Sequence, residues 1–408
     1  MIVKKLDNGI RIAYENRKGD LTSFCIGFDA GANSEKEDEI GFAHAVEHMV
    51  FKGTKKRKEY EINKMCDDIF GFSNAMTNYP YVIYYGTTLS EDFEKAFDIY
   101  SDIVMNPVFP DEGFSEEKNI ILSEFKEWKE DLGRFCEDEL FKNAFKKRRI
   151  KNLIIGNEEN IRNFQIDKLK KFYEENYFPG NCIISIVSSL SFDEAAGVVE
   201  RYMGKFKNEN GRSSDYNLCM ECNTSDEFVL RKQGIRESKI QFYFSIDGLS
   251  SREEKILRLF DEKFGKGTSS ILYDEIRTKN GLAYDVSTKI MNERGIKGYS
   301  ITAGTLPENA YKAVKIINKK VNTIESYEDC FEKSDILRMI KMIDLKNSIR
   351  FERSCELCKY ITENGIMFNS FETYKDQMDE MRDISWDDIL KVLKKVFVNP
   401  SVQIILPF

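Results

Sequence analysis

Residues 86–91 read Gly-Thr-Thr-Leu-Ser-Glu, and a similar segment, Gly-Thr-Leu-Pro-Glu, recurs at residues 304–308. Each segment leads into a stretch with apolar residues at helical spacing. A second pair follows the same order, because Phe-Lys-Gly-Thr at residues 51–54 matches Gly-Lys-Gly-Thr at residues 265–268. Ordered matches at a nearly constant offset indicate that the second half of the chain duplicates the first.

The duplication predicts two domains of one fold, and 408 residues are too many for a single typical core. In each half, strands with apolar residues at every second position alternate with amphipathic helices, as at residues 240–246 and 93–104. We therefore predict an α+β protein with two tandem homologous domains, each a largely antiparallel sheet backed by helices. The predicted boundaries are 1–207 for the first domain, 208–222 for a polar linker and 223–408 for the second domain.

Composition and charge exclude several classes of protein. The 69 acidic and 61 basic residues give a net charge of −8 and are spread along the chain, so they form no basic field for nucleic acid. No stretch approaches the roughly 20 apolar residues that span a bilayer, and the N-terminal residues lack the features of a signal peptide. We expect a soluble, cytoplasmic protein with no nucleic-acid or membrane partner.

The nine cysteines are odd in number and scattered, which favours reduced thiols over a disulfide framework. Two pairs, Cys219 with Cys222 and Cys355 with Cys358, have the spacing of redox or metal sites. They are far apart in the sequence and neither is flanked by histidine, so such a role is the weaker interpretation. A thiol or redox protein stays open as an alternative function.

The sequence His-Ala-Val-Glu-His holds the only two histidines of the chain, His44 and His48. The apolar residues around it predict a helix at residues 42–51, which places both histidines on one face, one turn apart. Two imidazoles at this spacing can bind one metal ion, whereas two histidines that merely satisfy local hydrogen bonds explain the spacing less well. Glu47 lies beside them, close enough to contact a water on the metal without being a ligand. This is the H-x-x-E-H order of the inverzincins.

A catalytic zinc site takes three protein ligands, so an acid from elsewhere is required. The candidate region is a predicted helix at residues 114–129, and the residues alone leave open which of its acids is the ligand. The chain resembles the pitrilysin/insulinase family of zinc peptidases, in particular short bacterial members and mitochondrial processing peptidase subunits, over nearly its whole length. Family members carry two glutamates seven residues apart on such a helix, and Glu117 and Glu124 match them. The resemblance implies zinc as the cofactor, Glu124 as the third ligand and Glu117 as a supporting acid.

The same resemblance implies substrate-binding residues in both halves. Asn74, Ala75 and Thr77 match the Asn-Ala-x-Thr stretch of the family, which lies on an edge strand that pairs with the substrate backbone. Arg277 and Tyr284 match a pair that binds the substrate carbonyl and stabilises the oxyanion. The second half has no H-x-x-E-H motif, so it looks like a degenerate copy retained for binding.

The implied function is that of a zinc metalloendopeptidase with Glu47 as the general base. Family architecture places four such domains around a closed chamber, so this chain is expected to dimerise, with itself or with a related subunit, around unfolded oligopeptides, leader peptides or presequences. Two departures from the family concern substrate preference: residues 149–156 replace a His-Pro-x-Gly stretch, and the usual proline after Glu124 is absent. The alternative is a non-catalytic subunit that binds peptides, which the retained His44, Glu47, His48 and Glu124 argue against.

Overall fold

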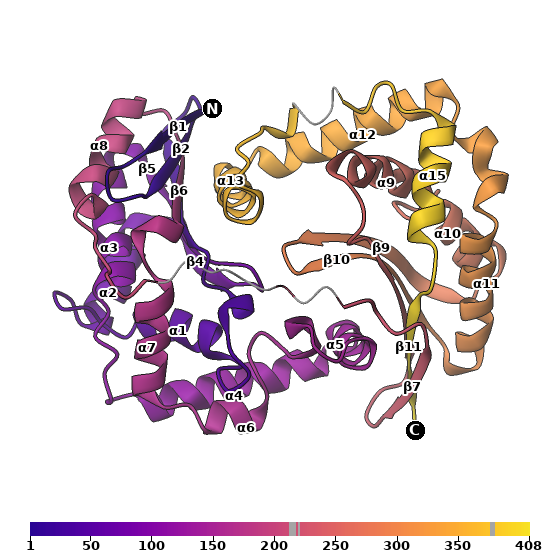
Figure 1. Cartoon of the computed structure of the whole chain (residues 1–408), viewed down its shortest axis with the longest axis horizontal. Coiled ribbons are helices and arrows are strands. Elements are labelled where there is room, and N and C mark those ends of the chain that lie inside the picture. Colours follow the sequence, from indigo (N-terminus) through magenta and orange to yellow (C-terminus); the bar gives the residue numbers. More distant parts are fainter. Residues whose placement is uncertain (212–217, 219–220, 376–379) are drawn as a thin grey trace. The chain divides into compact units, whose positions relative to one another are not determined.

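The computed structural model describes residues 1–211, 218, 221–375 and 380–408 (Figure 1). The chain forms two compact units. Unit 1 comprises Met1–Lys126, Asn152–Leu218 and Ile349–Thr373, and unit 2 comprises Glu127–Lys151, Cys219–Ser348 and Tyr374–Phe408. Relative to the predicted domains, the units therefore exchange two segments, residues 127–151 and residues 349–373. The predicted boundaries remain our proposal for the duplicated halves, and residues 212–217 and 219–220 of the predicted linker lie outside the described part.

Unit 1 contains a six-stranded sheet with β4 at one edge. Its strands, in spatial order, are β1 (Ile2–Lys5), β2 (Arg11–Asn16), β6 (Cys182–Ser188), β3 (Leu21–Phe28), β5 (Val82–Leu89) and β4 (Phe70–Thr77). All neighbours pair antiparallel except β2 with β6. The edge strand β4 pairs only with β5 among the described residues. Its other side therefore offers backbone donors and acceptors to an additional strand.

Helices cover both faces of this sheet. The helices of the larger core are α1 (Phe42–Val50), α2 (Glu59–Ile69), α3 (Phe93–Met105), α4 (Phe114–Glu130), α6 (Glu158–Arg162), α7 (Ile166–Asn176) and α8 (Phe192–Met203). The opposite face is covered by α13 (Ser354–Phe368), which packs on β3, β5 and β6 through Cys358, Ile361 and Ile366. A helix from the second half of the sequence thus completes the first unit.

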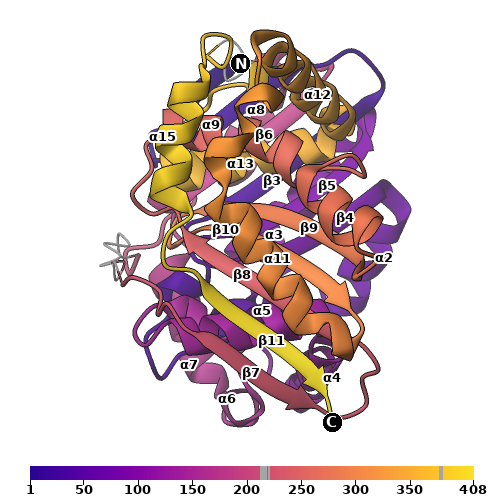
Figure 2. The ribbon, with the colours of Figure 1, turned by 90° about the vertical axis from the view of Figure 1, so that its right-hand side faces the viewer.

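Unit 2 has a five-stranded sheet, seen face-on in Figure 2. The order is β7 (Glu227–Lys232), β11 (Ser401–Pro407), β8 (Ser238–Ser245), β10 (Ile296–Thr305) and β9 (Ala283–Glu293). The helices of its main core are α9 (Ser251–Phe264), α10 (Ile271–Tyr273), α11 (Ala310–Asn322), α12 (Lys333–Phe351) and α15 (Trp386–Val396). The other face packs against α5 (Leu132–Ala144), whose Phe141 contacts Tyr243 ring edge to ring face.

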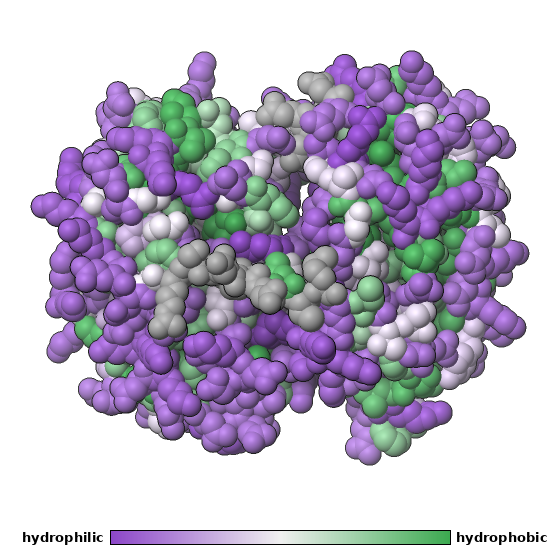
Figure 3. All heavy atoms as spheres, in the orientation of Figure 1, coloured by the Kyte–Doolittle hydropathy of each residue, from purple (hydrophilic) through white to green (hydrophobic). Residues whose placement is uncertain are grey.

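The two sheets repeat one topology. In unit 1, β2 pairs parallel with β6, and β3, β5 and β4 follow in antiparallel order; in unit 2, β7 pairs parallel with β11, and β8, β10 and β9 follow in the same way. The α+β prediction with largely antiparallel, helix-backed sheets is confirmed, with one parallel pair in each sheet. Among the described residues no helix is long and apolar enough to cross a bilayer. Hydrophilic residues predominate on the face shown in Figure 3, as expected for a chain in which 32% of residues are charged.

A glycine fixes where helix α1 begins. Gly41 precedes the helix with φ = 96°, a left-handed conformation that side chains beyond glycine rarely adopt. A Cβ atom at this position would also lie 2.7 Å from the carbonyl oxygen of Ile155. Because the chain turns so tightly here, α1 starts at Phe42, the start that its apolar pattern predicts.

Candidate metal centre

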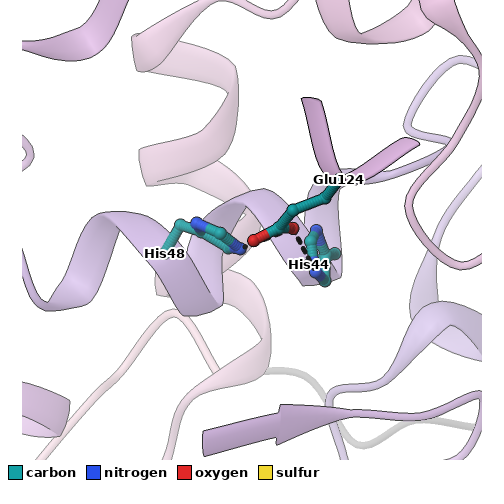
Figure 4. Close-up of side chains that lie close together, drawn as sticks. All are labelled: His44, His48 and Glu124. Carbon is teal, nitrogen blue, oxygen red and sulfur yellow. Dashed lines mark ion pairs between the residues drawn. The ribbon is translucent and has the colours of Figure 1, made fainter. Parts of the chain in front are cut away.

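Three side chains from two helices of unit 1 meet at one point. His44 and His48 lie one turn apart on α1, and Glu124 reaches both of them from α4, as Figure 4 shows. The Nε2 atoms of His44 and His48 lie 3.7 and 3.5 Å from the same Glu124 oxygen, Oε2. Within the described part of the chain, this is the only group of three or more histidine, cysteine or acidic side chains whose ligand atoms all lie within 4.8 Å of one another.

These three atoms fit a tetrahedral zinc ion. Zinc binds imidazole nitrogen and carboxylate oxygen at about 2.0–2.2 Å, so ligand atoms of a regular tetrahedron lie roughly 3.3–3.6 Å apart. The observed separations of 3.5 and 3.7 Å require only a small adjustment. Two nitrogens and one oxygen leave a fourth position open, which distinguishes catalytic from structural zinc sites.

Glu117 orients one of the two imidazoles. Its Oε1 lies 2.7 Å from Nδ1 of His48, so Nε2 of His48 faces Glu124. The other oxygen of Glu117 pairs with the ammonium of Lys52, which also lies 2.8 Å from Glu59. A carboxylate on the second nitrogen of a ligand histidine fixes the ring and makes it a stronger ligand. Glu117 is therefore placed to support a ligand and is not itself in the ligand group.

The two histidines have opposite electrostatic environments in the metal-free protein. Burial, together with repulsion from His48, lowers the pKa of His44 to about 3. Burial also opposes protonation of His48, but hydrogen bonds to Glu117 and Glu124 outweigh it and raise its pKa to about 9. His44 is thus already the neutral imidazole that metals bind, whereas His48 must lose a proton first.

Glu47 lies beside the ligands on α1 and is held by the edge strand. The hydroxyl of Thr77 on β4 donates a hydrogen bond to Oε2 of Glu47. Burial raises the pKa of Glu47, and the hydrogen bond from Thr77 partly offsets that effect. A half-buried carboxylate with a raised pKa, next to the candidate metal centre and outside its ligand group, is suited to accept and return a proton.

A cavity of about 600 Å³ opens next to the metal centre within unit 1. We call it the metal-side cavity. It is bounded by α1, α2 and β4 and lined by Glu47, His48, Phe51, Lys52, Glu59, Asn63, Cys66, Asp67, Ser73, Asn74, Ala75, Tyr100 and Glu117. Asn74 and Ala75 therefore lie in its wall, whereas Thr77 contacts Glu47. All three residues implied to bind substrate lie on β4, as expected, and Thr77 has an additional contact that the sequence did not indicate.

Arg277 and Tyr284 lie in unit 2 and contact one another. The guanidinium of Arg277 donates a hydrogen bond of 2.8 Å to the backbone oxygen of Tyr284. The hydroxyl of Tyr284 donates to Glu237, and the side chain is 44% exposed. Arg277 lies in a π-helical turn, Asp274–Lys279, that follows α10. These two residues form a local pair at an accessible position of their own unit.

Helix α1, which carries His44, Glu47 and His48 and which we call the metal helix, has a counterpart in the second half. The alignment of Phe-Lys-Gly-Thr with Gly-Lys-Gly-Thr places Asp261 of α9 opposite Glu47. Asp261 is buried and accepts hydrogen bonds from Thr288 on β9, at 2.5 Å, and from Tyr299, at 2.8 Å. Lys266 lies 3.3 Å from the same carboxylate. The position that matches Glu47 in unit 2 is therefore a buried carboxylate paired with Thr288, Tyr299 and Lys266.

Sequence reasoning missed Lys52, which joins Glu117 to Glu59. Its position four residues after His48, directly beyond the end of α1, was the available signal. Of the two cysteine pairs, only Cys355 with Cys358 lies wholly within the described residues. Cys355 and Cys358 are free thiols in an apolar cluster with Cys25, and burial raises the pKa of all three. Cys222 is free and exposed, and its partner Cys219 lies outside the described residues.

Family models match most of the chain. The model of the insulinase family, peptidase family M16, matches residues 11–158, and that of the peptidase M16 inactive domain matches residues 163–340. The metal helix lies in the first match, and Arg277 and Tyr284 lie in the second. The inactive label of the second model agrees with the absence of an H-x-x-E-H motif from the second half.

Several known proteins are similar to this chain. An uncharacterized zinc protease of Rickettsia felis is 25% identical over 99% of this chain and 97% of its own length, and one of Bacillus subtilis is 30% identical over 68% and 67%. The beta subunit of mitochondrial-processing peptidase from Dictyostelium discoideum is 33% identical over 50% of this chain and 44% of its own length. A solved protease structure from Helicobacter pylori shares the fold, with a TM-score of 0.89 and 18% identity over 100% of this chain and 99% of that one. The chain belongs to the insulinase family of peptidases, family M16.

Proposed function

We propose that this protein is a zinc metalloendopeptidase that hydrolyses peptide bonds in unfolded oligopeptides, leader peptides or presequences. The observation that carries the proposal is the meeting of three ligand atoms, from His44, His48 and Glu124, beside an acid that is not a ligand, Glu47. Relatives named zinc proteases support zinc as the metal. When bound, zinc would acidify a water molecule and polarise the scissile carbonyl.

The residues of the chain have distinct parts in this reaction. His44, His48 and Glu124 hold the metal, and Glu117 fixes the ring of His48. Glu47 accepts a proton from the attacking water and delivers it to the leaving amine, so the same carboxylate acts first as base and then as acid. Its contact with Thr77 holds it beside the edge strand along which the substrate would lie.

The edge strand accounts for the breadth of the proposed substrate class. An extended peptide that adds to β4 is bound through its backbone, which every sequence has in common. Asn74 and Ala75 would line its path, and the metal-side cavity would take a side chain next to the scissile bond. Most backbone groups of a folded protein are already paired within it, so unfolded segments are the expected substrates.

We further propose that the active form is cytoplasmic and is a dimer, either of two copies of this chain or of this chain with a related subunit. The support is the family, in which four domains of this kind enclose a chamber and this chain supplies two. Arg277 and Tyr284, which donate hydrogen bonds in unit 2, would then bind the substrate carbonyl and stabilise the oxyanion.

The decisive experiment measures metal content and cleavage of a quenched fluorescent peptide library on one purified sample, before and after chelation. About one zinc per chain with cleavage that chelation abolishes and zinc restores would establish the peptidase. Zinc without cleavage, even after a related subunit is added, would favour a subunit that only binds peptides. A sample that binds no metal would overturn the proposal.

A further inference from the structure

A second cavity lies in unit 1 at the other end of the edge strand. Its volume is about 530 Å³, and we call it the distal cavity. It is lined by Leu21, Ile69, Gly71, Phe72, Thr87, Thr88, Leu89, Glu352, Arg353, Ser354 and Cys355. The residues from β3, β4 and β5 meet the first turn of α13 here. None of the residues given a part in the reaction lines this cavity.

The rim of the distal cavity exposes large apolar side chains. Leu21, Phe72 and Leu89 are 52%, 42% and 47% exposed. Leu21 and Leu89 are direct partners across β3 and β5, so they form one continuous apolar surface. Exposed apolar side chains that cluster around a cavity are a sign of binding, whereas single exposed ones are ordinary.

A β-bulge turns Phe72 toward this cavity. Phe70 pairs with Thr88 and Phe72 pairs with Thr87, so Gly71 is the extra residue in β4. Without a bulge, Phe70 and Phe72 would lie on the same face of the sheet. With it, Phe70 packs in the main core, and Phe72 lies on the opposite face against Tyr85, with the Arg353 guanidinium 5.9 Å from its ring. Bulges that redirect a side chain are frequent next to active sites.

The edge strand connects the two cavities. Ser73, Asn74 and Ala75 line the metal-side cavity, and Phe72, three residues before Ala75 on the same strand, lines the distal cavity. At about 3.3 Å per residue, a peptide paired with β4 would cover this distance with three residues, roughly 10 Å. Two side chains of the peptide that are three residues apart point to opposite faces of the sheet, because side chains alternate along a strand. Ala75 and Phe72 lie on opposite faces in the same way.

We propose that the distal cavity is a second specificity site that binds an apolar side chain of the same extended peptide. This rests on the proposed peptidase function. In antiparallel pairing, the more stable arrangement, the peptide runs opposite to β4, so its C-terminal part lies at the distal cavity. The side chain bound there is three residues C-terminal to the one that faces the metal-side cavity. A leucine or phenylalanine at that position matches the lining in size and polarity.

The test compares Leu89→Asp with a matched control, Leu306→Asp. Leu306 is the counterpart of Leu89 in the duplicated segment and is similarly exposed, at 51%, but lies in unit 2. Leucine and serine are scanned through each position of a cleaved peptide on the C-terminal side of the scissile bond. The wild-type enzyme is expected to prefer leucine at one position, three or four residues from that bond. Leu89→Asp should raise KM for this peptide about tenfold and change kcat by no more than about twofold. For a peptide truncated before this position, KM and kcat should both stay within about twofold of the wild-type values. Leu306→Asp should behave like the wild type.

A binding measurement keeps the test of the distal cavity separate from the test of peptidase activity. Fluorescence anisotropy measures the affinity of the leucine and serine peptides for Glu47→Gln, alone and combined with Leu89→Asp, without turnover. If no peptide is cleaved, the same leucine and serine scan is made on an arbitrary unstructured peptide. Loss of the leucine preference in the double variant would support the distal site even where the peptidase proposal fails. Equal effects of Leu89→Asp and Leu306→Asp, or no leucine preference at any position, would overturn it.

Discussion

Thr77 on the edge strand donates a hydrogen bond to Glu47 on the metal helix, so the strand proposed to bind substrate also positions the proposed base. The contact joins β4 to α1 within unit 1. It gives Thr77 a second role besides its proposed pairing with substrate. A disturbance of the end of β4 should therefore reach the chemical step as well as binding.

We expect Thr77→Val, which keeps the shape of the side chain and removes the hydroxyl, to lower kcat about tenfold. The half-buried carboxylate of Glu47 would lose the hydrogen bond that orients it, a loss that commonly costs about 1–3 kcal/mol. Steady-state kinetics on a cleaved peptide, with zinc content measured in parallel, provide the check. Thr77→Ser should restore most of kcat, and zinc content should stay constant in both variants. A change confined to KM would assign Thr77 to substrate binding alone.

Replacement of Glu47 with Gln should lower kcat by a factor of about 10²–10⁴ while zinc content stays near one per chain. The amide keeps the size of the side chain and its contact with Thr77 but cannot accept the proton. Peptide affinity, measured by anisotropy, should be nearly unchanged. Near wild-type turnover in this variant would mean that another group accepts the proton.

Much of the site was predictable because local patterns encode it. The apolar residues around the H-x-x-E-H motif predicted α1, the helix predicted at residues 114–129 was found as α4, and the periodic strands predicted the sheets. The choice of Glu124 among the acids of α4 came from the family resemblance, since a charged helix alone does not reveal which acid faces the histidines. The sequence duplication likewise predicted that the two domains share one fold.

Contacts between distant segments were not predictable. The packing of α13 on the first sheet and of α5 on the second depends on side chains far apart in the sequence, as in the hydrogen bond from Ser185 to the backbone oxygen of Cys358. The bulge at Gly71 depends on its pairing with β5, which the sequence of β4 does not reveal. The alignment of the two halves pairs Asp261 with Glu47, but the contacts of Asp261 with Thr288 and Tyr299 depend on strands far along the chain and were not predictable.

Glu117→Gln should weaken zinc binding by about 10- to 100-fold, the usual cost of removing the partner of a ligand histidine. The amide cannot hold the ring of His48 through a charged hydrogen bond, and Lys52 would keep only one of its two carboxylate partners, Glu59. Competition with a chelator of known affinity gives the change in dissociation constant. Glu116→Gln is the matched control, because Glu116 is the exposed neighbour on the same helix and has no contact with the site. Equal affinities for the two variants would show that Glu117 does not support the metal.

Zinc binding should release about one proton per chain between pH 7 and pH 8, and the apparent zinc affinity should rise with pH up to about 9. The pKa of His48 in the metal-free protein is raised to about 9 by Glu117 and Glu124, so its imidazole is protonated in this range and must be deprotonated to bind zinc. A raised pKa also stabilises the metal-free fold below the unfolded value of about 6.5, and this contribution disappears as the pH rises through 9. Calorimetric titrations of zinc in buffers with different ionisation enthalpies give the number of protons released. In Glu117→Gln, His48 loses its closest carboxylate and its pKa falls, so proton release at pH 8 should fall well below one. Proton release that is absent in the wild type, or unchanged in the variant, would mean that His48 is already neutral in the metal-free protein.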